Sequence, residues 1–234
     1  MPAEPIPATE PSRTTPPAAR PRPRPKNRGF SRPELHVKVT LRSTHAQRVA
    51  GRNMIRVARA LYTMGVILHV IGDQDQAEQV ETIVAGKIRK VADALQQELG
   101  QLRRQREQSG IDQFPQYASP LSVTFRISSP QLSLYASLIQ GLDALTVETD
   151  TLWLGGLLTS RQHANIAYQW RRALVDLAVE IADIEQRART SAIGAGAAEE
   201  IAAREADAQG VVTVEDGGEL DLAGEDEEEA RDAA

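Results

Sequence analysis

The 234-residue chain contains no cysteine and few aromatic residues, which make up 4% of it. Without cysteine it can form no disulfide and offers no thiolate to a metal ion. No stretch reaches the roughly 18 consecutive apolar residues of a membrane-spanning helix, and the polar, proline-rich start lacks the apolar core of a signal peptide. We therefore expect a cytoplasmic protein without membrane contact.

Catalytic and cofactor-binding motifs are missing as well. The sequence has no glycine-rich phosphate loop, no G-x-S-x-G motif and no cysteine nucleophile. Its four histidines show no metal-ligand spacing among themselves or with nearby acidic residues. We expect neither an enzyme nor a metal or cofactor site.

Charge is distributed unevenly along the chain. Residues 36–110 carry 12 basic and 7 acidic side chains, whereas residues 191–234 carry 2 basic and 14 acidic ones. A positive first half with an acidic tail is common in nucleic-acid-binding proteins, where the tail can compete with DNA for the basic face. The alternative, that both ends of the chain are simply solvated tails, remains open.

Two short stretches, residues 37–42 and 122–127, alternate apolar and polar side chains in the manner of half-buried strands. The second resembles a copy of the first, 84 residues later, with Val39 aligned to Val123. A lone strand leaves its backbone unsatisfied, so we expect the two to pair antiparallel, with one face on helices. The solvent face would then present six polar side chains, which are Lys38, Thr40, Arg42, Ser122, Thr124 and Arg126.

Apolar residues at three- and four-residue spacing predict helices over 44–70, 76–108, 130–154 and 160–189. We expect Trp153, Tyr168 and Trp170 to be core anchors among them. The arginines at 48, 52, 56 and 59 form a second stripe along the first helix. Such a stripe is either a solvated face or a phosphate-contacting flank beside the strand.

These elements predict an α+β fold, mostly helical, with a two-stranded antiparallel ribbon packed on long helical hairpins. The core, residues 34–189, would consist of two strand–helix–helix units, 34–110 and 119–189. Residues 1–33 form a proline- and arginine-rich arm and residues 190–234 an acidic tail, and we expect both to be disordered.

A strand, a Ser/Thr helix start and two helices resemble the ribbon-helix-helix DNA-binding proteins, in which paired strands insert into the major groove. The resemblance implies that Lys38, Thr40, Arg42, Ser122, Thr124 and Arg126 read bases. It also implies phosphate contacts around the two helix starts, at Ser43, Thr44, Ser128 and Ser129. The arginine stripe, Arg48, Arg52, Arg56 and Arg59, begins within two turns of the first strand, where backbone phosphates would lie if that strand sat in the groove. The helices look longer than in that family, and the strand occurs twice in one chain, so the ribbon could close within a monomer.

Residues 34–189 are also similar to a family of accessory proteins from integrating conjugative elements. The similarity is carried by Gly51-Arg52-Asn53-Met54-Ile55-Arg56-Val57, Thr151-Leu152-Trp153-Leu154-Gly155-Gly156 and Tyr168-Gln169-Trp170-Arg171-Arg172. That family is grouped with the AcaB-type regulators of conjugative plasmids, which implies transcriptional control of transfer genes.

The leading hypothesis is therefore a transcriptional regulator that binds double-stranded DNA, with Arg42 and Arg126 on guanine edges. The alternative is a helical interaction protein of the transfer machinery, whose ribbon is purely structural and whose partners are other transfer proteins. A homodimer through the narrow apolar seam of residues 76–108 is compatible with both.

Overall fold

A computed structural model describes residues 33–71, 74–194, 196–199, 201–202 and 215–216. The arm predicted over 1–33 lies outside these residues except for Pro33, as does most of the tail beyond residue 202. The order of elements is β1 (Leu35–Leu41), α1 (Thr44–Ile71), α2 (Gln74–Gln108), β2 (Leu121–Ile127), α3 (Pro130–Leu154), α4 (Ser160–Gly194) and β3 (Glu215–Asp216). The predicted α+β fold, mostly helical, is confirmed.

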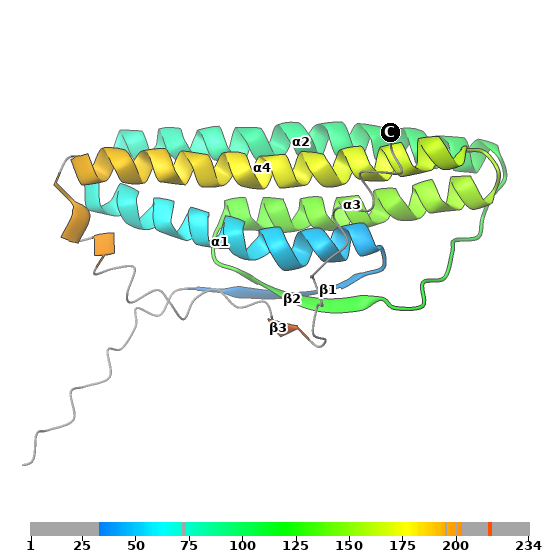
Figure 1. The fold of residues 1–234 in the computed structure, drawn as a ribbon, viewed down its shortest axis with the longest axis horizontal. Coiled ribbons are helices and arrows are strands. Elements are labelled where there is room, and N and C mark those ends of the chain that lie inside the picture. The colour runs from blue at the N-terminus through cyan, green and yellow to red at the C-terminus, as the bar shows by residue number, and fades with distance from the viewer. Residues whose placement is uncertain (1–32, 72–73, 195, 200, 203–214, 217–234) are drawn as a thin grey trace, which may run out of the picture. The chain divides into compact units, whose positions relative to one another are not determined.

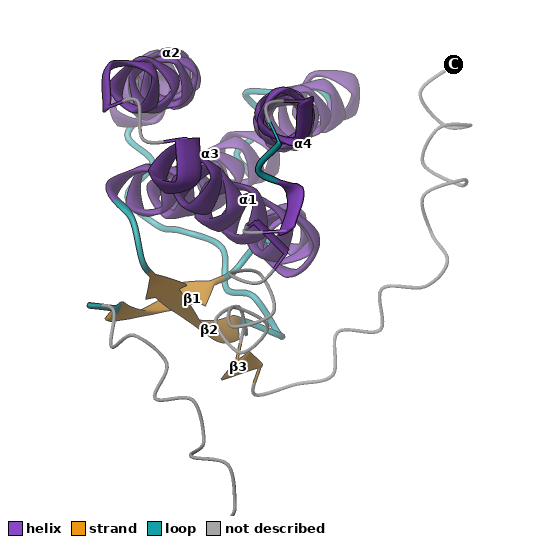
Figure 2. Cartoon of the chain, turned by 90° about the vertical axis from the view of Figure 1, so that its left-hand side faces the viewer, coloured by secondary structure: helices purple, strands orange, loops and turns teal. Residues whose placement is uncertain are grey.

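The described part of residues 32–234 forms three layers (Figures 1 and 2). The antiparallel β1–β2 ribbon covers one side of α1 and α3, and α2 and α4 lie on the other side of these two helices. β3 adds a two-residue strand beside β2, at the ribbon edge opposite β1. Both strands are amphipathic, so the ribbon buries its apolar face against α1 and α3 and turns its polar face outward.

The two strand–helix–helix units repeat with a period of 86 residues. β1 starts at residue 35 and β2 at 121, α1 at 44 and α3 at 130, and α2 at 74 and α4 at 160. The alignment at 84 made from the sequence was therefore wrong by two residues. Because strand side chains alternate with a period of two, a shift of two residues leaves every side chain on the same face of the strand. The predicted assignment of buried and outward side chains is therefore unchanged.

The helices of the two units are exchanged. α1 packs most extensively against α4, and α2 against α3, whereas the consecutive helices α1 and α2 touch little. The two long hairpins expected from the sequence are thus intertwined in one bundle, in which the second helix of each unit covers the first helix of the other. Neither unit has a complete core alone, and we expect the two to fold together.

The core lies between the ribbon, α1 and α3, and continues outward to α2 and α4. From the ribbon it includes Leu41 and Phe125, and from α3 Tyr135 and Leu142, all at most 1% exposed. Burying one such large side chain contributes roughly 1.5–3 kcal/mol to the free energy of folding. Trp170 packs against this core as predicted.

Two other predicted core anchors are not in the core. Trp153 is 40% exposed and Tyr168 is 44% exposed. Trp153 stacks on His163 at the turn between α3 and α4, and Tyr168 lies beside Arg171 and Arg172 on the surface of α4. Trp and Tyr have a large apolar ring and one polar N–H or O–H group, so they occur both in cores and at surfaces. Helical spacing alone therefore did not distinguish the core position of Trp170 from the surface positions of Trp153 and Tyr168.

The fourth helix runs past residue 189, the end expected from the sequence, to Gly194. Beyond it, Ile201 is buried with Ala192 of α4 and Ile67 of α1 in a small separate cluster. The packed part of the chain therefore extends to about residue 202. Among the described helices, none combines the length and apolar content needed to cross a membrane.

Candidate nucleic-acid interface

The outward face of the ribbon is built by strand alternation. Every second side chain, beginning with Val37 in β1 and Val123 in β2, points to the helices, and the residues between them point away. The outward residues face one another in three cross-strand pairs, His36 with Arg126, Lys38 with Thr124, and Thr40 with Ser122. On β1 all three are exposed, and on β2 Ser122 is exposed and the other two are half-buried.

Five of the six residues predicted to read bases lie on this face, and Arg42 does not. β1 ends at Leu41, so Arg42 is in the connection to α1. His36 also lies on this face, although the strand predicted from the sequence began only at Val37. Extending the alternation by one step towards the N-terminus would have found it.

At one end of the ribbon the outward face is charged. Arg126 donates from Nε and Nη2 to Oε2 of Glu34, at 3.1 and 2.8 Å. His36 lies near the same oxygen, with Nε2 at 3.7 Å. The Glu34 side chain is only 18% exposed, so the carboxylate fixes the direction of the Arg126 guanidinium. The opposite end is neutral, since Thr40 and Ser122 share a hydroxyl hydrogen bond of 3.3 Å.

The junction between β1 and α1 is held by a carboxylate from another helix. Asp143 of α3 is 3% exposed, and its Oδ1 accepts from the backbone N–H groups of Arg42 and Ser43 at 2.8 and 2.7 Å. Its Oδ2 accepts from Arg42 Nε at 3.2 Å. Asp143 thus places a negative charge at the positive N-terminal end of α1. Ser43 caps the same end, because its Oγ accepts a hydrogen bond from the N–H of Ala46.

This geometry changes the predicted roles of two residues. Ser43 is 2% exposed and its amide already donates to Asp143, so this amide is not available to a DNA phosphate. The Arg42 side chain is 45% exposed, and Asp143 holds its Nε. Arg42 therefore borders the ribbon at its neutral end, where it could reach a phosphate or a base edge without lying on the strand face.

The second junction, between β2 and α3, is built differently. Ser129 caps α3, its Oγ accepting from the N–H of Leu132 at 3.2 Å, and Pro130 follows at the first helical position. The residue 86 positions before Asp143 is Val57, a buried apolar side chain that cannot accept a hydrogen bond. The position equivalent to Asp143 therefore supplies no carboxylate to this junction.

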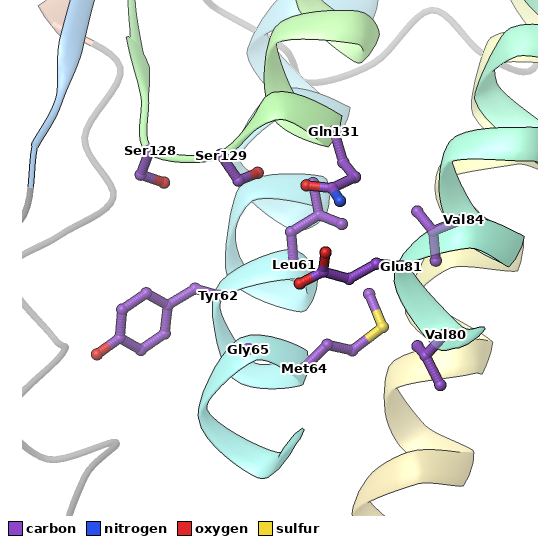
Figure 3. Close-up of a pocket in the computed structure, with 10 residues that line it drawn as sticks. All are labelled: Leu61, Tyr62, Met64, Gly65, Val80, Glu81, Val84, Ser128, Ser129 and Gln131. Atoms are coloured by element: carbon purple, nitrogen blue, oxygen red, sulfur yellow. The ribbon is translucent and has the colours of Figure 1, made fainter. Parts of the chain in front are cut away.

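A cleft of about 140 Å³ opens beside the second junction (Figure 3). Its walls come from α1, α2 and the start of α3, with Ser128, Ser129 and Gln131 along one side. Figure 3 shows the carboxylate of Glu81 on the side of the cleft that faces Gln131. The cleft leaves the β2–α3 connection accessible at its surface, and Ser128 is itself exposed.

The arginine stripe is mostly at the surface. Arg52, Arg56 and Arg59 are exposed on α1 and Arg48 is half-buried, while Thr44 is exposed in the first turn. Arg56 is close enough to Tyr135 for its positive charge to lower the pKa of that phenol, against the larger effect of burial, which raises it. Three of the four arginines of the stripe are thus exposed on the surface of α1.

Two polar clusters that the sequence analysis missed hold the connection between α2 and β2. Glu148, 5% exposed on α3, accepts from Arg106 Nε at 2.8 Å and lies 3.4 Å from Arg103 Nε. Arg106 also donates to the carbonyl of Ile111 and covers the ring of Phe114. Pairs separated by more than 40 residues leave no periodic signal in one sequence.

The second cluster centres on Asp150, whose carboxylate accepts from the Tyr117 hydroxyl and contacts His163 Nε2, both at 2.6 Å. Burial, and then the hydrogen bond to Asp150, raise the pKa of Tyr117 above its ordinary value. Together with Arg106 this cluster attaches Ile111, Phe114 and Tyr117 of the connection to the helices.

Comparison with solved structures gives a match to the crystal structure of selenomethionine-containing AcaB from uropathogenic E. coli. The TM-score is 0.72 and the sequence identity 42%, over 74% of this chain and 89% of that one. The chain belongs to the AcaB family. Comparisons with protein-family models and with curated proteins give no significant match.

Membership confirms the resemblance to AcaB-type proteins drawn from the three sequence motifs. Two of these motifs now have structural places. Gly51 to Val57 lies in α1, with Asn53, Met54 and Val57 buried, and Thr151 to Gly156 forms the end of α3 and the turn into α4.

Proposed function

We propose that this AcaB-family protein is a DNA-binding transcriptional regulator of an integrating conjugative element, and that its β1–β2 ribbon reads the major groove. The observation that carries the proposal is the outward face of the ribbon, a polar surface on the side away from the helices, with donors and acceptors from both strands. A two-stranded ribbon fits the major groove, which is about 12 Å wide.

The chemistry of the face suits base edges. Arg126 can form a bidentate contact with guanine, and Lys38 offers ammonium donors at the centre of the ribbon. The hydroxyls of Thr40, Ser122 and Thr124 can both donate and accept. Backbone phosphates would be contacted by Arg42 at one end, by Thr44, Ser128 and Ser129 at the helix starts, and by Arg48, Arg52, Arg56 and Arg59.

The test compares Arg126→Ala with Glu34→Gln in binding to promoter fragments of the element at two salt concentrations. Losing a bidentate arginine–guanine contact costs about 1–3 kcal/mol, so Arg126→Ala should weaken the specific fragment about tenfold or more and random DNA much less. Glu34→Gln should strengthen binding to random DNA, because it removes a negative charge from the interface. The ratio of the affinities for specific and random fragments should therefore fall.

Lys90→Thr on α2 serves as a control, because it removes an exposed cation from the layer opposite the ribbon. If Arg126→Ala weakens specific and random DNA equally, base reading by Arg126 is excluded. If the unmodified protein retains no fragment at either salt concentration, the proposal fails.

A second candidate function is protein contact within the transfer machinery. It is favoured by three exposed apolar side chains at the turn between α3 and α4, Trp153, Leu154 and Leu157, which are 40%, 64% and 37% exposed. Substituting Leu154 and Leu157 by serine should abolish complex formation with a transfer protein if this surface is used, and should leave DNA binding unchanged.

A further inference from the structure

We infer that one chain of this protein recognises a DNA sequence without two-fold symmetry, and that it binds this sequence in one orientation. The inference rests on the proposed function and concerns which class of DNA site the ribbon accepts. A ribbon of two identical chains presents the same residues to both halves of its site and therefore suits a palindrome. Here both strands come from one chain and differ in sequence.

The backbone of the ribbon is symmetric. β1 and β2 each have seven residues, related by the period of 86, and they pair so that the equivalent residues Lys38 and Thr124 face each other. A two-fold axis through that central pair therefore relates the two strands, and also α1 to α3 and α2 to α4. Such an axis would coincide with the local two-fold axis of a DNA duplex, so the frame alone would favour a palindromic site.

The side chains on this frame break the symmetry at every outward position. The axis relates His36 to Ser122, Lys38 to Thr124, and Thr40 to Arg126, and none of these pairs has the same chemistry. One end of the face carries Arg126, His36 and the carboxylate of Glu34, while the other carries the hydrogen-bonded hydroxyls of Thr40 and Ser122. The residue equivalent to Glu34 is Pro120, which has no charge.

The surroundings of the strands are asymmetric too. The carboxylate of Asp143 occupies the start of α1, where it accepts from the amides of Arg42 and Ser43. The start of α3 has Val57 in place of that carboxylate and borders an open cleft at Ser128 and Ser129. DNA backbone at the two ends of the ribbon would therefore meet different electrostatic environments.

The length of the face sets the size of the asymmetric site. The outward residues of one strand, from His36 to Thr40, span four strand rises or about 13 Å. At about 3.4 Å per base step, this covers about four or five base pairs. In a palindrome, the half that suits the Arg126 end would recur at the hydroxyl end. There the residue related to Arg126 is Thr40, and the neighbouring Arg42 lies in the connection to α1 with its Nε held by Asp143.

The experiment selects duplexes from a random pool with the full chain and measures the number of chains per duplex. The segment occupied by one chain is then rebuilt as two palindromes, one from each half and its inverted repeat. The selected segment should have no dyad, and both palindromes should bind about tenfold more weakly or worse. If either palindrome binds as tightly as the selected segment, the inference is overturned while DNA reading stands. If no duplex is enriched, the proposed function is overturned, and the inference with it.

A redesigned ribbon gives the converse test. H36S/K38T/T40R places the outward residues of β2 on β1, so that both strands carry the same set. All three positions are exposed, and we expect the fold to be kept. This variant should prefer the palindrome built from the half-site of β2 over the native segment, whereas Lys90→Thr should keep the native preference. Retention of the native preference by the redesigned ribbon would contradict the inference.

Discussion

At the scale of single residues, Asp143 is a buried carboxylate that links the two strand–helix–helix units. It is almost fully buried, comes from α3, and satisfies two amides and a guanidinium nitrogen at the start of α1. Because those donors belong to the other unit, one carboxylate joins the two halves of the chain at the edge of the ribbon. Its position could not be derived from the local sequence of either strand.

Asp143→Ala should lower the free energy of unfolding by roughly 3 kcal/mol, because it leaves buried donors without an acceptor. Asp143→Asn keeps one oxygen for the two amides and should cost less than half as much. Chemical denaturation measures both, with Asp176→Ala as the control, since Asp176 is 62% exposed in a surface pair. Equal small losses in Asp143→Ala and Asp176→Ala would show that the contact contributes little.

Because of Tyr135, we expect the free energy of unfolding to fall at alkaline pH. Burial raises the pKa of Tyr135 above its ordinary value of 10.0, and its hydroxyl donates to the carbonyl of Leu174. The folded chain therefore keeps the phenol protonated where the unfolded chain ionises, so this stabilisation is complete below pH 10 and is lost progressively above it.

Tyr135→Phe should be less stable than the parent at pH 8 by about 1 kcal/mol, the value of one buried hydrogen bond. Between pH 8 and pH 11 the parent should lose about 1.4 kcal/mol that Tyr135→Phe keeps, since only the parent has this titration, so the difference should vanish or reverse its sign by pH 11. Denaturation curves at the two pH values measure the change. A difference that stays constant with pH would mean that Tyr135 does not contribute to the alkaline loss.

At the scale of elements, the seam between α2 and α3 depends on a glycine. A methyl group added at Gly141 of α3 would lie 2.5 Å from Cδ2 of Leu95, a core residue of α2. Gly86 is also inside a helix, but a methyl group added there meets nothing within 4 Å. Alanine substitution at Gly86 therefore measures helix propensity alone, whereas the same substitution at Gly141 also measures packing between α2 and α3.

Gly86→Ala should raise the free energy of unfolding by about 0.5–1 kcal/mol, because alanine restricts the unfolded chain and favours helix. Gly141→Ala gains the same propensity but must displace Leu95 from a close-packed core, which typically costs 1–3 kcal/mol. We expect it to be at least about 1 kcal/mol less stable than Gly86→Ala. The idea of close packing at Gly141 would be wrong if both variants gained equally in thermal or chemical denaturation.

At the scale of the whole molecule, the C-terminal segment carries negative charge, as does the DNA that we propose as ligand. Residues 217–234 carry 8 acidic side chains and 1 basic one, directly after β3 at the edge of β2. If the ribbon binds DNA, such a segment competes with phosphate for the same cations.

Deleting residues 217–234 should therefore tighten binding to random DNA several-fold at low salt, with a smaller gain at high salt because the effect is electrostatic. The measurement is binding of the shortened and full chains to one random duplex over a salt series. A matched control replaces the eight carboxylates by amides at constant length. Unchanged affinity in both would exclude competition by the tail.

The exchange of helices has a consequence at the same scale. Since α1 packs on α4 and α2 on α3, the two units share one core. The six outward residues are therefore held on one frame without a second chain. The ribbon thus combines two different strands of one chain on a single face.

The sequence by itself determined the elements and their faces. Alternation in β1 and β2 and the three- and four-residue spacing in the helices are local, periodic signals, and a buried face imposes them on every turn or pleat. They predicted α3 from residue 130 to residue 154 and the antiparallel pairing of the strands. Three local motifs were enough to identify the AcaB family, which the match to a solved member confirmed.

Only the tertiary structure decided which helices are partners, where the repeat begins, and how the ends of the ribbon are occupied. The choice between hairpins and exchanged helices depends on packing between surfaces of equal apolar character, which one sequence does not distinguish. The pairs Asp143 with Arg42, Glu34 with Arg126, and Glu148 with Arg106 join residues 42 to 101 positions apart. Such contacts follow from the folded geometry, and no local pattern in the chain records them.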